Sequence, residues 1–353
     1  LLRALKACDS KGVIHISKVL YHWRAIAGST ALSAGEKSYT TEAGIKALSD
    51  FFGKDSSIEV EAGLLPNTYK VNWPIPENQP LVSLIIPTYN GYEITKQAID
   101  SILEKTTYEN YEILLVDNNS DCPVSLKYFE SLDKLSNVTV LRYPYPFNYS
   151  AINNFAAKQA KGSVIGLINN DVEVISPNWL TELVSNALRP DVGCVGAKLY
   201  FENDTIQHGG VIAGVGGVAG HSHKYFKRSA HGYFGRLSLV QNLSAVTAAV
   251  LVVRKDVFEE VGGLNEVDLT VAFNDVDFCL KVMSAGYRNL WTPYAELYHY
   301  ESISRGVEDN PVKVARFNSE ADYMKKTWGD LLAQDQYYNS NLTVSKEDYS
   351  IGM

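Results

Sequence analysis

The sequence predicts an α/β fold in which a mainly parallel central sheet is flanked by helices, with a small α+β extension on its N-terminal side. Two observations predict this fold. From residue 81 onward, apolar strand-like runs alternate with helical stretches, and each helical stretch is long enough to cross over between parallel strands. The size agrees, since 353 residues that are 46% hydrophobic and 20% charged suffice for one large core and a smaller unit.

The first 80 residues predict the extension. Residues 41–53 carry apolar side chains at helical spacing and end at a glycine. Residues 57–73 alternate around a Pro-Asn turn, which predicts a hairpin, and residues 74–80 hold three prolines, which is typical of a linker. We therefore expect three parts: an extension and linker (1–80), a main domain (81–330) and a C-terminal tail (331–353).

The regular part of the main domain is expected between residues 81 and 200. Strands are predicted at 81–87, 111–117, 138–143, 163–169 and 191–200, and helices at 92–106, 123–134, 149–162 and 176–188. Ser176 is the expected N-cap of the last of these helices, with Pro177 at its first position.

The later part of the domain is less regular. We expect a β-type run at 244–255, a helix at 273–286, a strand that enters a polar loop at 288–306, and a terminal helix at 314–329. Residues 207–224 are rich in glycine, but no strand–turn–helix with a following ribose-binding acid frames them. They therefore do not predict a dinucleotide-binding turn.

Composition narrows the function classes. A net charge of −8 with scattered Lys and Arg argues against a nucleic-acid partner. The four cysteines lie far apart without a CxxC pair, which argues against structural zinc. There is no apolar run of 18 residues, so no membrane-spanning helix is expected. The start, LLRALKACDSKG, does not resemble a signal peptide, and we expect it to lie inside a longer polypeptide.

Polar residues follow three of the predicted strands at their carboxyl ends, at positions 87–90, 117–120 and 169–171. Ligands of parallel sheets bind at these ends, so one site is expected to gather all three segments. The carboxylate of Asp171 suits Mg²⁺ or Mn²⁺, which take oxygen ligands and often share them with phosphates. A carboxylate at Asp117 can accept hydrogen bonds from a base or a ribose hydroxyl.

Five stretches, in this order, resemble the inverting family 2 glycosyltransferases of the GT-A fold: VSLIIPTYNGYEITKQAIDSIL, YEILLVDNNS, NNDVEV, FNDVDFCLK and HYESISRG. The resemblance covers residues 81–328 and is closest to bacterial enzymes of O-antigen and surface-polysaccharide assembly. In addition, SKVLYHWRAIAGSTA resembles the tail of a preceding transferase module in multi-domain members.

The resemblance implies roles on the donor side. The nucleotide pocket would comprise Pro87, Thr88, Tyr89, Asn90, Asp117 and Asn170. The metal, Mn²⁺ or Mg²⁺, would be held by Asp171 and His299, and the diphosphate and donor sugar would lie near Asn169, Ser304 and Arg305. Asn169 stands where the family carries an Asp, so weaker metal binding is expected.

On the acceptor side, the resemblance makes Asp275 the general base, which takes the proton of the acceptor hydroxyl as it attacks the anomeric carbon. Asn274 stands where the family carries a Glu. Further acceptor contacts are expected from Asn274, Asp277, His221 and His223. Asp275 and Asp277 lie about 200° apart around a helix, so only one of them readily faces a given site.

These roles imply a metal-dependent inverting glycosyltransferase. The expected donor is a UDP-hexose, with dTDP-rhamnose as the next candidate, and the expected acceptor is a lipid-linked or free oligosaccharide of a growing surface glycan. We expect a cytoplasmic protein in peripheral contact with the inner face of the bacterial plasma membrane, joined to other modules of the same polypeptide.

Two rival functions are a catalytically silent GT-A-like module that binds glycan or acts as a scaffold, and a nucleotidyltransferase. The Asn substitutions at both acidic motifs favour the first, while PTYNGYE lacks the Gly-rich basic loop of the second. The candidate residues also have ordinary structural interpretations: turn formation for Asp117 and Asp171, first-turn acids for Asp275 and Asp277, and packing for His299.

Overall fold

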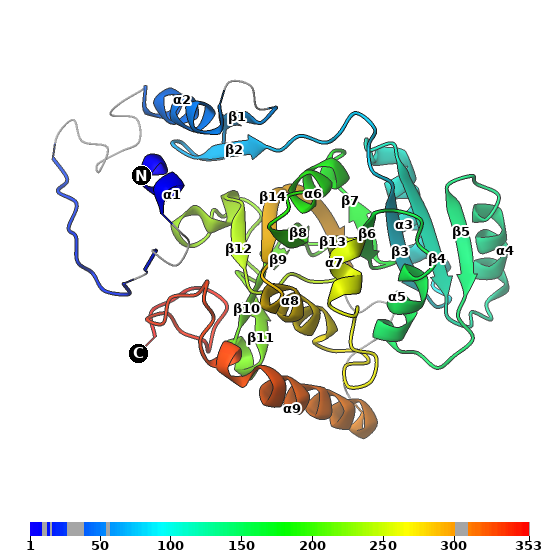
Figure 1. Cartoon of the computed structure of the whole chain (residues 1–353). Coiled ribbons are helices and arrows are strands. Elements are labelled where there is room, and N and C mark those ends of the chain that lie inside the picture. The colour runs from blue at the N-terminus through cyan, green and yellow to red at the C-terminus, as the bar shows by residue number, and fades with distance from the viewer. Residues whose placement is uncertain (9–12, 15, 27–38, 54–56, 301–309, 353) are drawn as a thin grey trace.

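The computed structural model describes residues 1–8, 13–14, 16–26, 39–53, 57–300 and 310–352 (Figure 1). Its centre is a sheet with the strand order β12 (Gln241–Leu243), β14 (Arg288–His299), β8 (Val192–Tyr200), β13 (Val250–Arg254), β6 (Val164–Ile168), β3 (Val82–Thr88), β4 (Tyr111–Asp117) and β5 (Val138–Arg142). Two short strands pair at its side: β7 (Val172–Val174) with β14, and β9 (Ile206–His208) with β8. Six of the eight strands on the main path run in one direction, and β12 and β13 oppose them. The predicted mainly parallel sheet is confirmed.

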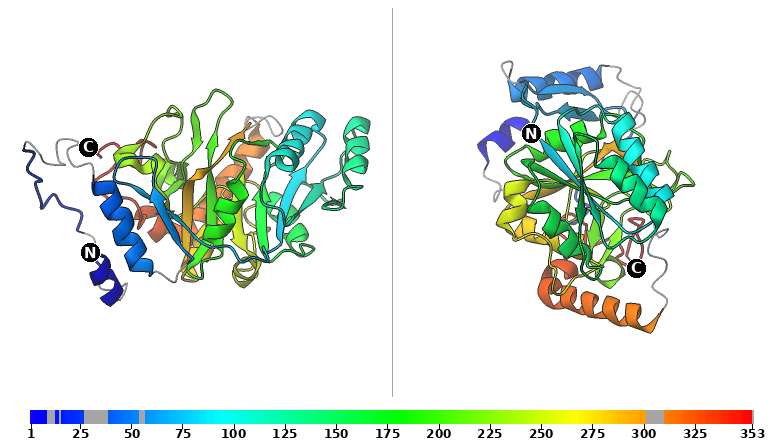
Figure 2. Two further views of the ribbon diagram at one scale, coloured as in Figure 1. Left: turned by 90° about the horizontal axis from the view of Figure 1, so that it is seen from above. Right: turned by 90° about the vertical axis from the view of Figure 1, so that its right-hand side faces the viewer.

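Helices cover both faces of the sheet, as two views of the ribbon show (Figure 2). One face carries α3 (Tyr92–Lys105), α4 (Pro123–Leu132) and α6 (Trp179–Ala187), and the other carries α5 (Tyr149–Ala157), α7 (Lys255–Glu260) and α8 (Asn274–Ser284). Fully buried aromatic side chains anchor these layers, Trp179 on the first face and Phe278 on the second. Since both faces are covered, the central strands are mostly apolar, and every residue of β8 is buried.

Two local predictions were wrong. Helix α6 begins at Trp179 rather than after Ser176, because the Ser176 hydroxyl accepts the backbone N–H of Glu296 and ties the segment to β14. The β-type run at 244–255 is a strand only from Val250. Before it the chain turns, with the Ala249 carbonyl accepting the N–H of Asn169, and this turn forms part of the cleft described below.

The predicted extension is confirmed as a helix and a hairpin, seen above the sheet in Figure 1. Helix α2 (Thr40–Phe52) ends at Gly53, whose φ of +94° favours glycine, and β1 (Glu59–Ala62) pairs antiparallel with β2 (Tyr69–Asn72). A cation–π contact joins the extension to the main domain, since the Arg189 guanidinium lies 4.1 Å from the centre of the Trp73 ring, just after β2. A short helix, α1 (Leu2–Ala7), precedes this unit.

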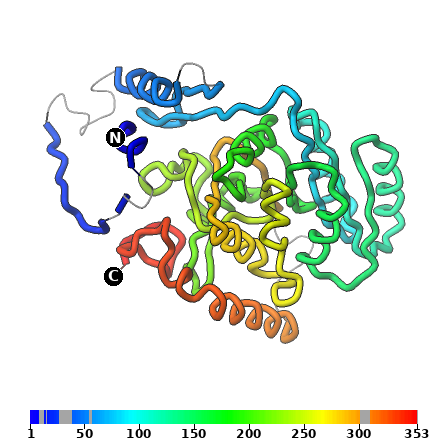
Figure 3. Tube along the Cα trace, viewed as in Figure 1, coloured from blue at the N-terminus to red at the C-terminus, as the bar shows by residue number. Residues whose placement is uncertain are grey.

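The C-terminal region packs onto the glycine-rich segment. There β10 (Val211–Ala213) and β11 (Ala219–His221) form a small hairpin, followed by the 3₁₀ turn η4 (Tyr233–Ser238). Helix α9 (Pro311–Ala333) spans the boundary expected at 330, and the chain after it runs beside β10 and β11 (Figure 3). The buried Asp335 carboxylate accepts the N–H of Ala213 at 2.8 Å and the Ser244 hydroxyl at 2.7 Å. The tail is therefore part of the domain's packing. Among the described residues, no helix is both long and apolar enough to cross a bilayer.

Candidate active site

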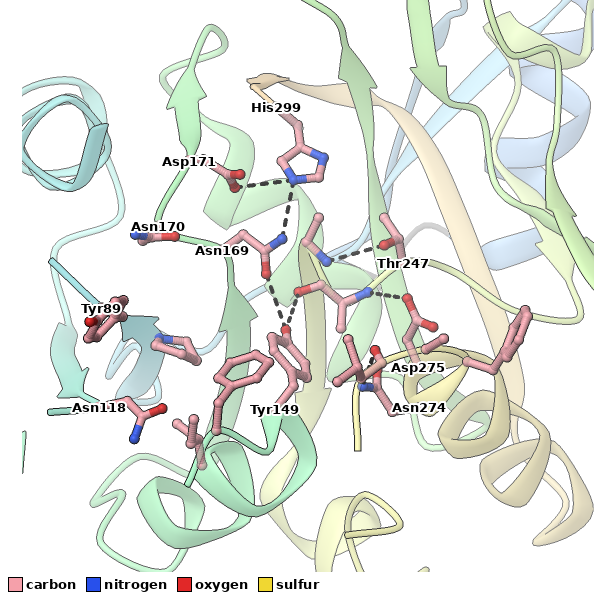
Figure 4. A pocket seen from close by; sticks show the side chains of 18 of the residues that line it. Tyr89, Asn118, Tyr149, Asn169, Asn170, Asp171, Thr247, Asn274, Asp275 and His299 are labelled. Carbon is pink, nitrogen blue, oxygen red and sulfur yellow. Dashed lines mark hydrogen bonds and ion pairs between the residues drawn. The ribbon is translucent and has the colours of Figure 1, made fainter. Parts of the chain in front are cut away.

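A cleft of about 890 Å³ opens at the carboxyl ends of the central strands (Figure 4). Its walls come from segments far apart in the sequence. The predicted residues that line it are Pro87, Thr88, Tyr89, Asn169, Asn170, Asp171, His221, Asn274, Asp275 and His299. The structure thus brings together most of the residues singled out from the sequence, and it adds others, including Asn118, Asn119, Tyr145, Tyr149 and Thr247.

The donor-side wall begins at the end of β3. Tyr89 follows this strand and leaves 56% of its surface exposed, so its ring is open to stacking by a planar ligand. Asn118 and Asn119 follow the neighbouring strand β4, and the Asn118 side chain donates to the Tyr145 carbonyl at 2.7 Å (Figure 4). The sequence could have indicated these two amides, because they directly follow Asp117 in the polar segment after the strand.

Two predicted nucleotide ligands do not line the cleft. Asp117 is completely buried, accepts the N–H of Ser120 at 2.9 Å and forms an ion pair with Arg142. The side-chain oxygen of Asn90 accepts the N–H of Cys122 at 2.9 Å, which braces the neighbouring loops. Both side chains satisfy main-chain donors of turns, which is the ordinary interpretation of Asp and Asn at such positions.

Asn170 lines the cleft, but its side-chain amide forms hydrogen bonds with protein groups behind the cleft wall. Its amide donates to the Thr95 hydroxyl at 3.0 Å and to the Thr88 hydroxyl at 3.3 Å, and only 8% of the residue is exposed. Asn170 therefore fixes the turn between β6 and β7 against β3 and α3, and so sets the direction of its neighbour Asp171.

A carboxylate and an imidazole meet beside this turn. Oδ1 of Asp171 lies 3.2 Å from Nε2 of His299, and Nδ2 of Asn169 lies 3.2 Å from the same nitrogen. The pairing of β7 with the end of β14, where His299 lies opposite Val172, holds these groups together. An oxygen and a nitrogen ligand at this spacing fit a divalent ion such as Mn²⁺ that takes further ligands from phosphate. Among the described residues no cluster of three or more His, Cys, Asp or Glu surrounds such an ion.

Asp275 comes from the first turn of α8 and faces the cleft from the opposite side (Figure 4). Its Oδ2 accepts the N–H of Ala248 at 3.0 Å, and its Oδ1 accepts the N–H of Val276 at 2.9 Å. Phe273, the N-cap residue of α8, has a φ of +59°, a conformation that a bulky side chain rarely adopts. This backbone conformation starts the helix and directs Asp275 into the cleft, while the buried Asn274 donates to the Val271 carbonyl.

Two predicted acceptor residues lie elsewhere. Asp277 is 1% exposed, accepts the indole N–H of Trp328 at 2.9 Å and faces α9, on the far side of α8 from the cleft. His223 is fully buried and stacks on Tyr349 with ring centres 4.7 Å apart. The structure therefore does not support acceptor contacts for either residue. Ser304 and Arg305 lie outside the described residues.

Residues 83–262, just over half of the chain, match the family described as "Glycosyl transferase family 2". The chain belongs to glycosyltransferase family 2. The sequence-based family prediction is confirmed, and so is its likeness to proteins of O-antigen assembly.

Three relatives illustrate this family membership. The uncharacterized protein y4gI of Sinorhizobium fredii is 50% identical over 99% of this chain, and the O-antigen biosynthesis protein RfbC of Myxococcus xanthus is 37% identical over 99% of it. The chain spans only 39% and 27% of the length of these two relatives. An Escherichia coli protein, the "UDP-Glc:alpha-D-GlcNAc-diphosphoundecaprenol beta-1,3-glucosyltransferase WfgD", is 31% identical over 37% of the chain and 49% of its own length.

Two solved structures share the GT-A fold of this family 2 domain. GalNAc-T7 with UDP, GalNAc and Mn²⁺ superposes with a TM-score of 0.58 at 16% identity, covering 77% of this chain and 53% of that one. The Pyrobaculum calidifontis mannosyltransferase PcManGT with GDP-Man and Mn²⁺ gives 0.54 at 14% identity, covering 88% and 81%. The predicted fold class is therefore confirmed.

Proposed function

We propose that this domain transfers a sugar from a nucleotide-sugar donor to a hydroxyl of a growing glycan, with inversion at the anomeric carbon. One observation carries the proposal: a single cleft holds a carboxylate–imidazole pair, Asp171 and His299, and across from it a second carboxylate, Asp275, in the first turn of a helix. This arrangement separates a place for the diphosphate from a place for the attacking hydroxyl.

The donor nucleotide would lie against the β3–β4 side of the cleft. The exposed ring of Tyr89 offers a stacking surface, and the Asn118 and Asn119 region offers amide groups for a base or ribose. A UDP-hexose is the favoured donor, with dTDP-rhamnose next. The relative WfgD, named as a transferase that uses UDP-Glc, supports a uridine donor.

Asp171 and His299 would hold Mn²⁺ or Mg²⁺, and the Mn²⁺ in both solved neighbours supports this assignment. When bound, the ion offsets the negative charge that develops on the departing nucleoside diphosphate. Asn169 in place of an acid leaves the protein one negative charge short, so the diphosphate itself would have to supply much of the affinity for the ion.

Asp275 would act as the general base. It accepts the proton of the acceptor hydroxyl as that oxygen bonds to the anomeric carbon and the bond from this carbon to the phosphate oxygen breaks. Hydrogen bonds from the N–H groups of Ala248 and Val276 hold the carboxylate in place before the transfer.

The chain's first residues support a modular polypeptide. Leu20-Tyr21-His22 repeats the Leu297-Tyr298-His299 sequence that ends β14, and a short helix precedes each of the two segments. In this chain the first copy is exposed, with Leu20 at 69% and Trp23 at 63%. We infer that residues 1–26 belong to the tail of a preceding transferase module and that residues 74–80 link the extension to the domain from 81. The acceptor would be a lipid-linked oligosaccharide at the inner face of the plasma membrane.

The decisive experiment measures binding of UDP, dTDP, GDP and CDP by thermal shift and calorimetry, each with and without Mn²⁺. Metal-dependent binding of one nucleoside diphosphate, lost in Asp171→Ala, is expected. A folded protein that binds none of them would favour the silent module instead. Release of nucleoside diphosphate rather than pyrophosphate during turnover would separate sugar transfer from nucleotidyl transfer.

A further inference from the structure

Helix α9 carries a buried carboxylate that binds the loop before α8. Glu320 is 2% exposed, and its Oε1 accepts the Thr270 hydroxyl and the N–H of Val271, both at 2.9 Å. Its Oε2 accepts the N–H of Ala272 at 3.0 Å. The Arg316 guanidinium, one turn earlier on α9, pairs with the same carboxylate at 2.7 Å. Hydrogen bonds to an ionised acceptor are about twice as strong as neutral ones, so this contact fixes the loop firmly.

The loop that Glu320 holds leads directly to the candidate base. Val271 and Ala272 line the cleft, Phe273 follows as the N-cap of α8 with its φ of +59°, and Asp275 lies two residues further. A bulky side chain keeps such a strained conformation only where its surroundings impose it. Glu320 supplies part of this restraint, because it binds two of the peptide N–H groups that lead to Phe273.

Helix α9 contacts the same region at two further points, and in Figure 1 it runs beside α8. The Phe317 ring lies 5.3 Å from the Phe273 ring, centre to centre, and the Trp328 indole N–H donates to Asp277 at 2.9 Å. These contacts bracket position 275 along the chain. They are made by side chains on side chains, whereas Glu320 acts on the main chain and so on the direction in which α8 begins.

We propose that Glu320 is a positioning residue for Asp275. By fixing the backbone at 270–272, it keeps the positive φ of Phe273 and the start of α8 that directs the Asp275 carboxylate to the Ala248 N–H and the cleft. Glu320 itself does not line the cleft, so it acts through Asp275 and not on the substrate. The inference rests on the proposed transferase function, and it gives α9 a part in the geometry of the reaction.

The positioning can be tested without any turnover. The Ala248 N–H binds Asp275 at 3.0 Å, so native-state hydrogen exchange of this amide, followed by NMR at pH 7, reports whether the carboxylate is in place. A hydrogen bond to a charged group contributes about tenfold or more to such an equilibrium, so Glu320→Ala should speed this exchange by about that factor, as Asp275→Ala should. Unchanged Ala248 exchange in Glu320→Ala would overturn the proposal. If the Ala variant does not fold, Glu320→Gln, which keeps one acceptor oxygen, should show a smaller increase, and no increase would again overturn it.

A double-mutant cycle tests the link to the reaction. A shift of about 1 Å at a reacting group can cost about 10²-fold in rate, so Glu320→Ala should lower kcat per nucleotide-binding site by about 10- to 100-fold. The calorimetric Kd of the nucleoside diphosphate should stay unchanged. In an Asp275→Asn background the same substitution should cause little further loss, because the group through which it acts is already gone. Equal losses in both backgrounds, or a wild-type kcat in Glu320→Ala, would overturn the proposal.

Glu182→Ala is the matched control for the loss of a buried carboxylate. Glu182 is 8% exposed and accepts the Thr292 hydroxyl at 2.7 Å on the other face of the sheet. Its removal should lower the free energy of unfolding but change neither kcat per binding site nor Ala248 exchange. A wild-type protein that neither binds nucleotides nor transfers sugar would refute the transferase function, and hydrogen exchange would still decide whether Glu320 positions Asp275.

Discussion

The two sides of the cleft are built in different ways. On the donor side, Tyr89, Asn118 and Asp171 each lie just past the end of a long strand or in the turn that follows it. On the acceptor side, the walls come from three-residue strands, the turn at 247–249 and the first turn of α8. Main-chain groups of that turn hold Asp275 and His208 there.

This difference distinguishes a donor site that depends on the sheet itself from an acceptor site that can change without altering the sheet. A diphosphate site at the ends of parallel strands uses the geometry of the sheet itself. A sugar acceptor differs between enzymes, and turns and short strands can change with little effect on the sheet. Substitutions on the two sides should therefore affect different measurements, with donor binding on one side and acceptor use on the other.

The largest effect is expected from Asp275→Asn. Loss of a general base commonly costs about 10²- to 10⁴-fold in rate, so transfer should fall by that factor while calorimetric affinity for the nucleoside diphosphate stays the same. Asp268→Asn, which changes an exposed acid of the preceding loop, should retain wild-type transfer. An Asp275→Asn rate within threefold of wild type would show that another group takes the proton.

On the donor side, Asp171→Ala should weaken metal-dependent binding of the nucleoside diphosphate. Loss of an outer-shell partner of a metal ligand already costs about 10- to 100-fold in affinity, so loss of the ligand itself should cost at least that much. Calorimetry with and without Mn²⁺ measures it.

Adding a carboxylate to the same turn, rather than removing one, gives a matched test of the metal site. Asn169→Asp adds a carboxylate 3.2 Å from the His299 nitrogen and should tighten Mn²⁺ binding, because it restores the missing charge. If Mn²⁺ affected neither wild-type nor Asn169→Asp binding, the metal assignment would be wrong.

Asp335→Ala should destabilise the acceptor side of the cleft, because Asp335 holds the segments behind it together. The carboxylate accepts hydrogen bonds from Ala213, Ser244 and Tyr337, and each buried donor left without a partner costs about 1–3 kcal/mol. We expect the free energy of unfolding in urea to fall by at least about 2 kcal/mol, and KM for the acceptor to rise more than the donor Kd. Asp322→Ala, on the exposed face of α9, is the control and should change neither.

The smallest effect concerns acid stability. Burial lowers the pKa of His223 to about 4. The unfolded chain then binds this proton more readily than the folded protein between about pH 6.5 and 4, so stability falls as the pH drops through this window. At pH 5 the loss from this residue is about 2 kcal/mol. His223→Gln should lose less stability than wild type between pH 7.5 and 5; an equal loss would contradict the assignment.

Sequence reasoning performed best where the fold is regular. The strand–helix alternation after residue 81 located the sheet, and polar strand ends correctly placed Thr88, Asn169 and Asp171 on the cleft. At Asp117 the structure shows a second use of a strand-end carboxylate, because this side chain accepts the N–H of Ser120 in its own turn and does not line the cleft. Sequence position does not distinguish these outcomes.

In the second half of the domain, helical periodicity predicted that only one of Asp275 and Asp277 readily faces a given site. In the structure Asp275 lines the cleft, and Asp277 binds Trp328 on the other side of the helix. The pairing of His208 with His221, whose Nδ1 atoms lie 3.0 Å apart, had no comparable signal. It depends on two three-residue strands that meet across a hairpin rich in glycine, and such short strands leave almost no periodic pattern.

The turn at 247–249 has a consequence for protein engineering. Its contacts to His208, Asp275, Asn169 and Tyr149 all pass through main-chain N–H and C=O groups. The Thr247 hydroxyl braces the turn by accepting the N–H of Ala249 at 3.3 Å, whereas the side chain of Ala248 takes no part in these contacts, although both residues line the cleft. A small library at position 248 alone would reshape the space for the incoming glycan while the reacting groups keep their supports, which makes this position a natural place to select for new linkages.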